Sequence, residues 1–432
     1  MKTSLAQSEL QARLSTIEPL LNAVAVFILA TIFLFWDGSR AAYVLLALAA
    51  LVFVIKYRPQ LPTDQRLYAW PIIVYFGASA LSVLVNGLES SGINSLGSRS
   101  LLLLMAIPLV SIFYLSFNSE RNTWIKFAVA CMVMGAQALF DALVLNDYRA
   151  DGGHNASAFG FTALAMTAMV ISSYYRFSPV RFGKAFYFLA ILMGVFAIVL
   201  SGTRTAWLAG FAVIVTAIAF YPHRYSLLKR ALFAITLVVA ISIASSFLPV
   251  VQKRIDQMVK IVAPYVKGEE QAKFNSLNKR VELWKLGWQI GMENKILGLG
   301  HGNIKQVVND YIDQTPRLQG VGNKSHLHNQ FMQTFAMSGL VGLFFFLALL
   351  ICHFWIFIKY LGRQYSQEVR CLALAGLLLM VSYLIKSFPG VPFYGKQYLL
   401  MYGFASAAIW GSLLGALRES ENRTAPTTPD TQ

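Results

Sequence analysis

Long apolar runs dominate the chain and alternate with short polar connections. A hydrocarbon core about 30 Å thick needs roughly 20 apolar residues in helical form, and runs near that length recur throughout the sequence. They lack the alternation of a membrane-barrel strand. The pattern predicts an all-α polytopic membrane protein with about 12 transmembrane helices. The expected spans are 19–36, 41–55, 69–87, 100–116, 123–144, 156–175, 185–201, 205–221, 231–248, 331–358, 371–385 and 397–417.

One long polar segment, residues 249–330, interrupts this pattern. It carries 12 of the 36 Lys and Arg residues and 3 of the 6 His residues. Helical spacing of apolar residues predicts amphipathic helices at 249–266, suited to lie on the membrane surface, and at 281–292. A glycine-rich turn and a short helix at 304–312 should follow. The expected domains are 1–248 (N-terminus and spans one to nine), 249–330 (loop domain), 331–418 (spans ten to twelve) and 419–432 (a disordered tail).

The net charge of +16 is best interpreted as a topology signal rather than as a sign of nucleic-acid binding. Short loops on one side carry 18 Lys and Arg residues, and those on the other carry 6. Cytoplasmic loops are the ones enriched in positive charge. Both termini are therefore expected in the cytoplasm, and the loop domain outside, which in a bacterial inner membrane means the periplasm. The 6 outer cations are Arg40, Arg99, Arg149, Arg204, Lys386 and Lys396.

Arg204 follows Ser201, Gly202 and Thr203 between two apolar runs, at the expected outer face. It could be a snorkelling flank residue. It could also clamp an anion, because a guanidinium binds phosphate oxygens as a rigid fork. In that case Gly202 would let the backbone approach closely, and the hydroxyls of Ser201 and Thr203 would add donors.

Arg280 begins the second amphipathic helix of the loop domain. One interpretation is a solvated charge paired with the nearby Glu282. The other is a second phosphate ligand that acts together with Arg204.

The loop domain ends in His326-Leu327-His328-Asn329, directly before an apolar run. The segment could be a plain polar helix start or a pair of metal ligands, although no Cys or nearby carboxylate completes a metal set. Alternatively His328 is a general base, since imidazole takes a proton from a hydroxyl near neutral pH. Asn329 could orient the ring or a substrate. His301, within the glycine-rich stretch 298–302, is expected in a tight turn, because no strand precedes it.

The outer loops contain no paired carboxylate motif of the kind that a metal-dependent sugar transferase uses. No metal or other cofactor is therefore expected. The span interiors carry almost no charge, with Asp141 as the main exception. Ion-coupled transporters place ionisable groups there, so this composition disfavours transport.

Five motifs occur in order: Ser201-Gly-Thr-Arg204, Arg280-Val-Glu-Leu-Trp284, Gly298-Leu-Gly-His-Gly302, His328-Asn329 and Gly339-Leu-Val-Gly342. Together they resemble the O-antigen ligase and O-antigen polymerase superfamily of bacterial inner membranes, over roughly residues 200–345. The resemblance implies a GT-C-like glycosyltransferase that needs no metal or ATP. It would move a glycan from undecaprenyl pyrophosphate to an acceptor in the periplasm.

The resemblance also implies roles for single residues. Arg204 and Arg280 match the essential arginines of the superfamily, and His328 matches its essential histidine, whereas His301 and His326 have no role that transfers. Ligases use lipid A–core oligosaccharide as acceptor, and this is the favoured interpretation. Alternatives are a polymerase that uses a second lipid-linked glycan, a protein O-oligosaccharyltransferase that uses Ser or Thr, and a lipid-linked glycan transporter without chemistry.

Overall fold

The computed structural model describes residues 19–32, 36–88, 90–117, 120–145, 149–173, 183–220, 226–266, 276–315, 318 and 326–424. Within these ranges the regular elements are all helical, which confirms the predicted all-α polytopic membrane protein. In the same ranges nine helices are long and apolar enough to cross a membrane. They are α2 (Trp36–Tyr57), α3 (Gln65–Val85), the segment Ser90–Leu115, α7 (Glu120–Leu143), α8 (Ala156–Ser173), α9 (Gly183–Leu200), α15 (Gln330–Lys359), α16 (Gln367–Ser387) and α17 (Lys396–Thr424).

Three further apolar helices coincide with the other expected spans. They are Pro19–Thr31, α10 (Arg204–Phe220) and α11 (Leu227–Ser246). The two shortest expected spans, 41–55 and 371–385, correspond to the full-length helices α2 and α16. The total of twelve crossings stays a prediction.

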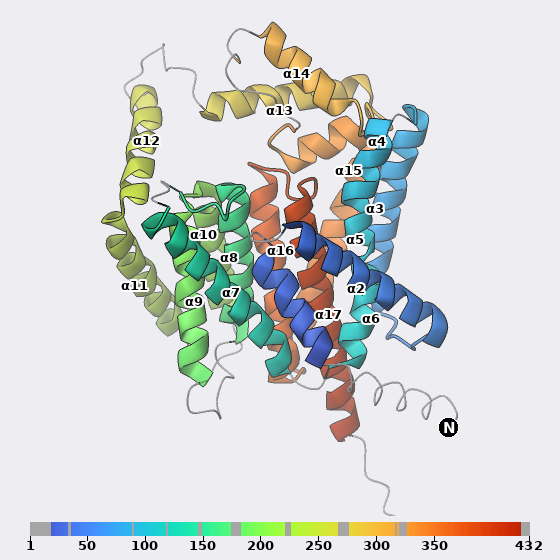
Figure 1. Ribbon diagram of the computed structural model, residues 1–432, viewed down its shortest axis with the longest axis vertical. Helices are drawn as coiled ribbons and strands as arrows, with labels where there is room; N and C mark the ends of the chain where they lie inside the picture. Colours follow the sequence, from blue (N-terminus) through green and yellow to red (C-terminus); the bar gives the residue numbers. More distant parts are fainter. Residues whose placement is uncertain are drawn as a thin grey trace, which may run out of the picture.

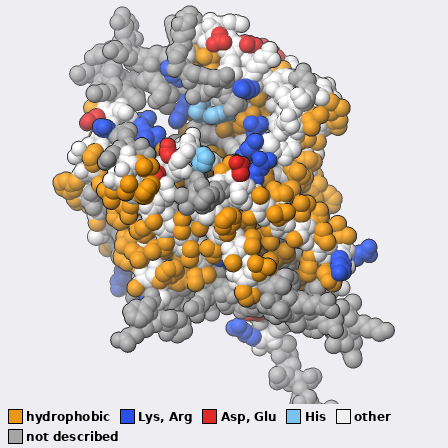
Figure 2. Space-filling model, viewed as in Figure 1, with side chains coloured by type: hydrophobic (Ala, Val, Ile, Leu, Met, Phe, Trp, Pro, Cys, Tyr) orange, Lys and Arg blue, Asp and Glu red, His pale blue; other side chains and the backbone are white. Residues whose placement is uncertain are grey.

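The helices form one bundle, with α17 and α16 at its centre (Figure 1). Helices α7 to α10 lie on one side of this pair, and α2, α3, α5 (Leu101–Leu104) and α6 (Ala106–Leu115) lie on the other. The outward faces carry exposed apolar side chains, among them Leu45, Phe211 and Ile351. They make a broad hydrophobic band (Figure 2). Such a band is stable where lipid solvates it and every backbone polar group is paired inside a helix.

Three helices of the expected loop domain lie at one end of the bundle, which we call the α13 end (Figure 1). They are α12 (Pro249–Val266), α13 (Ser276–Glu293) and α14 (Ile304–Gln314), so the three expected helices are confirmed. Leu283 and Ile290 of α13 pack with Val308 and Ile312 of α14 in a small separate core. Helix α12 continues upright from α11 instead of lying across the bundle as α13 does, so a flat surface position is not observed.

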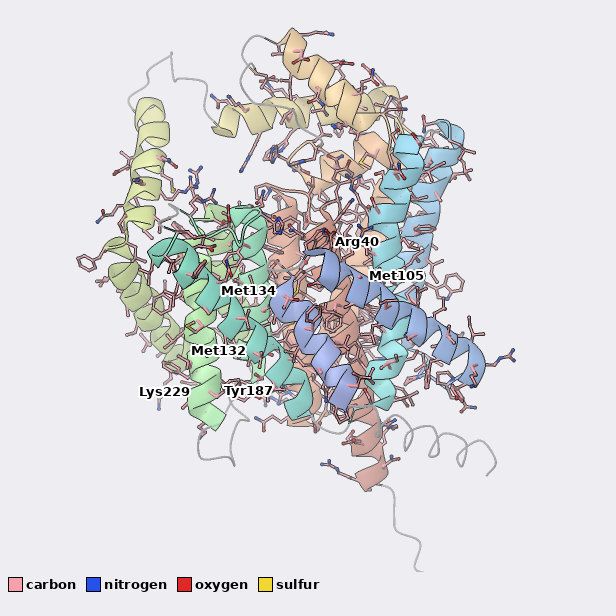
Figure 3. All side chains as sticks on the ribbon, in the orientation of Figure 1. Arg40, Met105, Met132, Met134, Tyr187 and Lys229 are labelled. Atoms are coloured by element: carbon pink, nitrogen blue, oxygen red, sulfur yellow. The ribbon has the colours of Figure 1, made fainter. Side chains whose placement is uncertain are left out.

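Cations mark the two ends of the bundle. Arg40 lies toward the α13 end, whereas Lys229 lies at the opposite end (Figure 3). At that opposite end Lys359 of α15 and Tyr360 both contact the carboxylate of Asp64. Arg40 thus lies on one side, and Lys229 and Lys359 on the other, as the charge pattern predicts for these three residues.

The expected span 331–358 corresponds to α15, but α15 is not one continuous helix. Helix α15 breaks at Gly339, whose φ of +62° and ψ of −159° are not helical. A Cβ at Gly339 would lie 2.3 Å from the carbonyl oxygen of Ile296. The first half of α15, residues 330–338, ends at this break, and the spanning half follows it. A long apolar pattern alone cannot reveal the break, because its cause lies in a remote segment.

Residues 295–300, which follow α13 and run into the glycine-rich stretch 298–302, pair the backbone groups freed by this break. Two amides of this segment donate to carbonyls of the first half of α15, and two amides after the break donate to carbonyls of the segment. The four hydrogen bonds are Leu299 N to Ala336 O (2.8 Å), Gly300 N to Met337 O (3.1 Å), Leu340 N to Lys295 O (2.7 Å) and Val341 N to Ile296 O (3.2 Å). The predicted tight turn is confirmed, and its hydrogen bonds stabilise the break in α15.

The fourth expected span begins about ten residues earlier than 100. It is assembled from α4 (Ser90–Ser95), the π-helical turn η1 (Leu96–Ser100), α5 and α6. A π-helical turn widens the helix locally and is frequent at functional sites. This one carries Arg99 at the α13 end of the bundle.

Candidate functional site

Lys, Arg and His side chains gather around a hollow at the α13 end, just above the hydrophobic band (Figure 2). The turn between α9 and α10 leads into Arg204, the first residue of α10. Gly202 of this turn has φ +58°, a left-handed conformation that glycine adopts without strain. A Cβ at Gly202 would approach Val250 of α12 to 2.9 Å. Glycine therefore allows α12 to pack directly onto the turn.

The two hydroxyls of this turn are used inside the protein. Ser201 Oγ donates to the carbonyl oxygen of Ile198 (2.8 Å), and Thr203 Oγ1 donates to that of Ala156 (2.8 Å). Arg149 Nε donates to the Ser201 carbonyl oxygen (2.8 Å). The expectation that Ser201 and Thr203 offer donors to a ligand is therefore corrected: both side chains are buried and hold the turn in shape.

Arg280 on α13 lies close enough to Arg204 for their charges to repel. Burial lowers the pKa of Arg280, and the charge of Arg204 lowers it further. Glu282, the alternative partner considered for Arg280, is paired with Lys285 (2.9 Å). In the described part of the chain no carboxylate pairs with Arg204 or Arg280. Two half-buried guanidiniums thus lie close together, and neither pairs with a carboxylate of the described residues.

Lys386, in the last turn of α16, completes this group and was missed by the sequence analysis. Its side chain is only 4% exposed. Nζ donates to Ser157 Oγ (2.7 Å) and Thr205 Oγ1 (3.2 Å), and the charges of Arg280 and Arg149 act on it. From the sequence alone Lys386 counted only as an outer-loop cation, because a sequence does not show which side chains are buried. Burying a charge is costly unless an opposite charge compensates it, so this lysine indicates an anion site.

His328 joins the cations through α13. Trp284 Nε1 donates to the backbone carbonyl oxygen of His328 (3.1 Å). Trp284 follows Arg280 by one helical turn, so both project from the same face of α13. His328 itself has φ +55°, an uncommon conformation for a non-glycine residue. The ring of His326 stacks obliquely near that of His328, at 4.3 Å between centroids.

The next residues fix the start of α15. Asn329 Oδ1 accepts from the backbone N–H of Met332 (3.0 Å), as an N-cap does. Gln333 Oε1 accepts from the backbone N–H of Leu327 (2.8 Å). Asn329 therefore caps the helix, which its sequence position did not specify. The positive end of the helix dipole lies beside His328.

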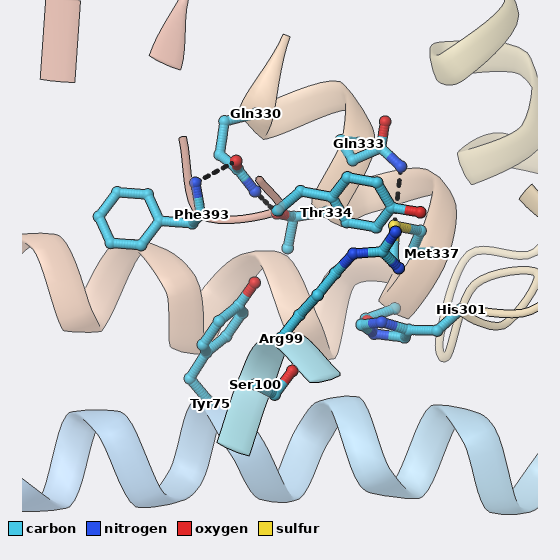
Figure 4. A pocket seen from close by; sticks show the side chains of 11 residues that line it. Tyr75, Arg99, Ser100, His301, Gln330, Gln333, Thr334, Met337 and Phe393 are labelled. Atoms are coloured by element: carbon cyan, nitrogen blue, oxygen red, sulfur yellow. Dashed lines mark hydrogen bonds between the residues drawn. The ribbon is translucent and has the colours of Figure 1, made fainter. Parts of the chain in front are cut away.

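His301 lies apart from this group, in a polar crevice beside the first half of α15 (Figure 4). Its Nε2 bonds Ser338 Oγ (3.0 Å). Burial lowers the pKa of His301 to about 4, and the nearby charge of Arg99 contributes. The ring is therefore neutral at pH 7 and supports the break in α15 next to Gly339.

An apolar groove of about 510 Å³ runs between α15 and α16 on the lipid-facing surface. Phe331 and Leu384 line its end nearest the α13 end, and Ile358 lines its far end. Phe331 follows His328 by three residues, and Leu384 precedes Lys386 by two. The groove therefore ends level with the last turn of α16, which carries Lys386 on a different side of the helix.

A sequence model of the family described as O-antigen ligase matches residues 188–347. This match supports membership of the O-antigen ligase superfamily. The match contains Arg204, Arg280 and His328, whereas Lys386 and Arg99 lie outside it. A protein of Haemophilus influenzae described as uncharacterized is 24% identical over 370 residues, which covers 84% of this chain and 90% of that protein. Membership of the O-antigen ligase superfamily implies glycosyltransferase-like activity on lipid-linked glycans in general.

Proposed function

We propose that this protein is an O-antigen ligase that transfers a glycan from undecaprenyl pyrophosphate to lipid A–core oligosaccharide. The observation that carries the proposal is the group of Arg204, Arg280 and Lys386. These cations come from three separate helices and, among the described residues, lack a carboxylate partner. Arg280 also lies one helical turn before Trp284, which donates to the backbone of the candidate base His328.

The cations suit a diphosphate leaving group. Negative charge grows on the diphosphate as the bond to the anomeric carbon breaks, so fixed positive groups stabilise the transition state more than the ground state. Lys386 donates to two hydroxyls, and its ammonium has three donors. Nζ also lies 5.7 Å and 5.4 Å from the ring centroids of Phe161 and Tyr398, so in this scheme Lys386 acts on the diphosphate through its positive charge. The planar guanidiniums of Arg204 and Arg280 would supply further hydrogen-bond donors to the diphosphate.

The groove between α15 and α16 suits the polyprenyl chain of the donor. Its lining is almost entirely apolar and open to lipid, and it ends beside Phe331 and Leu384. A polyprenyl chain laid along it would bring its diphosphate to the cationic hollow. Burial of apolar surface would then hold the chain at about 25 cal/mol per Å².

His328 would act as the base. The acceptor hydroxyl oxygen attacks the anomeric carbon while the bond from that carbon to the diphosphate oxygen breaks. The hydroxyl proton passes to the His328 imidazole, and the electron pair of the broken bond leaves with the diphosphate. One displacement of this kind inverts the anomeric centre. The hydrogen bond from Trp284 positions the backbone that carries His328.

The positive charge in this scheme comes from protein side chains, so we propose a reaction without a metal cofactor. Transfer should continue in excess EDTA. The account further places the protein in the bacterial inner membrane, with the α13 end in the periplasm and both termini in the cytoplasm. Support for this orientation comes from the cation-poor short loops at the α13 end.

The experiment combines purified full-length protein with undecaprenyl pyrophosphate-linked glycan and rough lipopolysaccharide, in parallel with donor alone. A ligase adds glycan to the lipopolysaccharide, whereas a polymerase lengthens the donor glycan without it. Arg204→Ala, Arg280→Ala and His328→Ala should each abolish transfer. Lys285→Ala, on the same helix as Arg280 but exposed, should retain it. Absence of any glycan transfer by the wild-type protein would refute the proposed activity, and wild-type turnover by one of the three variants would remove that residue.

A further inference from the structure

A second group of cations lies at the α13 end, outside the region that matches the family. It consists of Arg40 at the start of α2, Arg99 on η1 and Lys396 at the start of α17. Arg40 and Arg99 lie close enough to Lys396 for their charges to act on it. Nothing in the glycan-transfer scheme above uses these residues.

Arg99 is held firmly in place. Its Nη1 donates to Ser95 Oγ (2.5 Å), and its guanidinium lies 3.9 Å from the ring centroid of Tyr394. Stacking on an aromatic face leaves the edge donors of a guanidinium available for bidentate binding. The π-helical turn that carries Arg99 is a local departure from regular geometry of a kind that clusters at functional sites.

The guanidinium of Arg99 stands at a crevice lined with polar side chains of the first half of α15 (Figure 4). Gln330, Gln333 and Thr334 contribute from α15, and Tyr75 contributes from α3. The free volume of the crevice is about 10 Å³, which is close to the space of one water molecule. An incoming anion would therefore bind at the mouth of the crevice, against Arg99, and would not enter it.

The charges of this group are not neutralised by the described part of the protein. No carboxylate in the described part of the chain pairs with Arg40, Arg99 or Lys396. All three side chains are half-buried. Like charges this close repel one another more strongly where water is partly excluded. An arrangement of three such cations is stabilised when an anion binds between them.

We propose that Arg40, Arg99 and Lys396 bind a phosphate group of the acceptor glycolipid, an inference that rests on the proposed transfer reaction. That reaction brings together two membrane glycolipids, and the cations around Arg204 are assigned to the donor diphosphate. The first half of α15 connects the two places. It begins two residues after the candidate base at His328, and its residues Gln330 and Thr334 line the crevice of Arg99. An acceptor anchored here would have its sugar hydroxyls within reach of the start of α15.

The test measures acceptor binding without donor, so that no turnover occurs. Full-length protein in detergent is titrated with rough lipopolysaccharide, and separately with the same material after chemical removal of its phosphates. The wild-type protein should bind the phosphorylated form at least about tenfold more tightly, because charge-assisted hydrogen bonds are lost with the phosphates. The double variant Arg99→Gln/Lys396→Gln should lose this preference, and Lys285→Gln, which removes one exposed positive charge from α13, should keep it.

Three results would overturn the assignment. One is equal binding of the two forms by the wild-type protein, and another is an unchanged preference in the double variant. The third is displacement of lipopolysaccharide by phosphatidylglycerol micelles at equal concentration, which would identify a general headgroup site. Arg40→Gln replaces the double variant if thermal unfolding shows that the latter is not folded. A binding preference without any glycan transfer would refute the proposed function but leave the phosphate site in place.

Discussion

The indole Nε1 of Trp284 donates a hydrogen bond to the backbone carbonyl oxygen of His328 over 3.1 Å. This bond ties α13 to the short segment that precedes α15. Arg280 lies one turn before Trp284 on α13, so one helix positions both a candidate diphosphate ligand and the candidate base. Their spacing therefore depends on how α13 packs onto the bundle.

Replacing Trp284 tests this coupling. Trp284→Phe keeps an aromatic ring but removes the donor, so the backbone at His328, already in an uncommon conformation, should become less well fixed. We expect kcat to fall about tenfold, while the KM for the donor changes little, as is typical when a positioning interaction is lost. Trp288→Phe is the control, because Trp288 lies on the same helix and is 55% exposed. Equal activity of the two variants would show that the Trp284 bond does not position the base.

Lys386 provides a second prediction. Lys386→Met keeps the length of the side chain and removes its charge, and the buried site should accept an apolar group without loss of folding. We expect transfer to fall at least a hundredfold, comparable to the loss of a preorganised donor in other active sites. Ser157→Ala, which removes one acceptor of the ammonium, should have a smaller effect. Wild-type kcat in folded Lys386→Met protein would exclude this lysine from the site.

The sequence predicted those parts of the fold that depend on local patterns. Spans follow from apolar length, and α12, α13 and α14 follow from helical spacing, so both agree with the structure. The break at Gly339 did not follow, because its cause is contact with Lys295 and Ile296, more than 40 residues earlier. The upright position of α12 depends on its packing against Gly202 and α11, which no local pattern encodes.

The candidate site was accessible from sequence only in part. Arg204, Arg280 and His328 stand in motifs that resemble a family, which singled them out. Lys386 has no such motif, and its importance rests on burial and on hydroxyls that α8 and α10 supply. The internal hydrogen bonds of Ser201, Thr203 and Asn329 were not predicted for the same reason, since hydrogen-bond partners are not visible in a sequence.

The break in α15 should tolerate no side chain at position 339. Gly339→Ala places a Cβ 2.3 Å from the Ile296 carbonyl oxygen in a left-handed conformation. We expect a loss of stability of about 3 kcal/mol or more, and little folded protein. Gly77→Ala is the control, because a Cβ at Gly77 in α3 meets nothing within 4 Å. Thermal unfolding in detergent measures both, and equal midpoints would mean that the break is not needed.

The buried imidazole of His301 predicts a pH dependence of stability. Its pKa is about 4 in the folded protein because of burial and of Arg99, whereas an unfolded chain binds this proton near pH 6.5. Between these values the unfolded state holds more protons, so stability decreases as the pH falls from 6.5 to 4, by roughly 3 kcal/mol at most. In His301→Gln the unfolding temperature should fall less steeply over this window than in the wild type. Identical slopes would show that His301 does not carry the effect.

The central claim is that Arg204, Arg280 and Lys386 hold the donor diphosphate beside His328. It is tested most directly by a structure of the full-length protein in nanodiscs with undecaprenyl pyrophosphate bound. The account predicts density for the diphosphate within hydrogen-bond distance of all three side chains, and for the chain along the groove lined by Phe331 and Leu384. A diphosphate bound elsewhere, or one out of reach of both arginines, would contradict it.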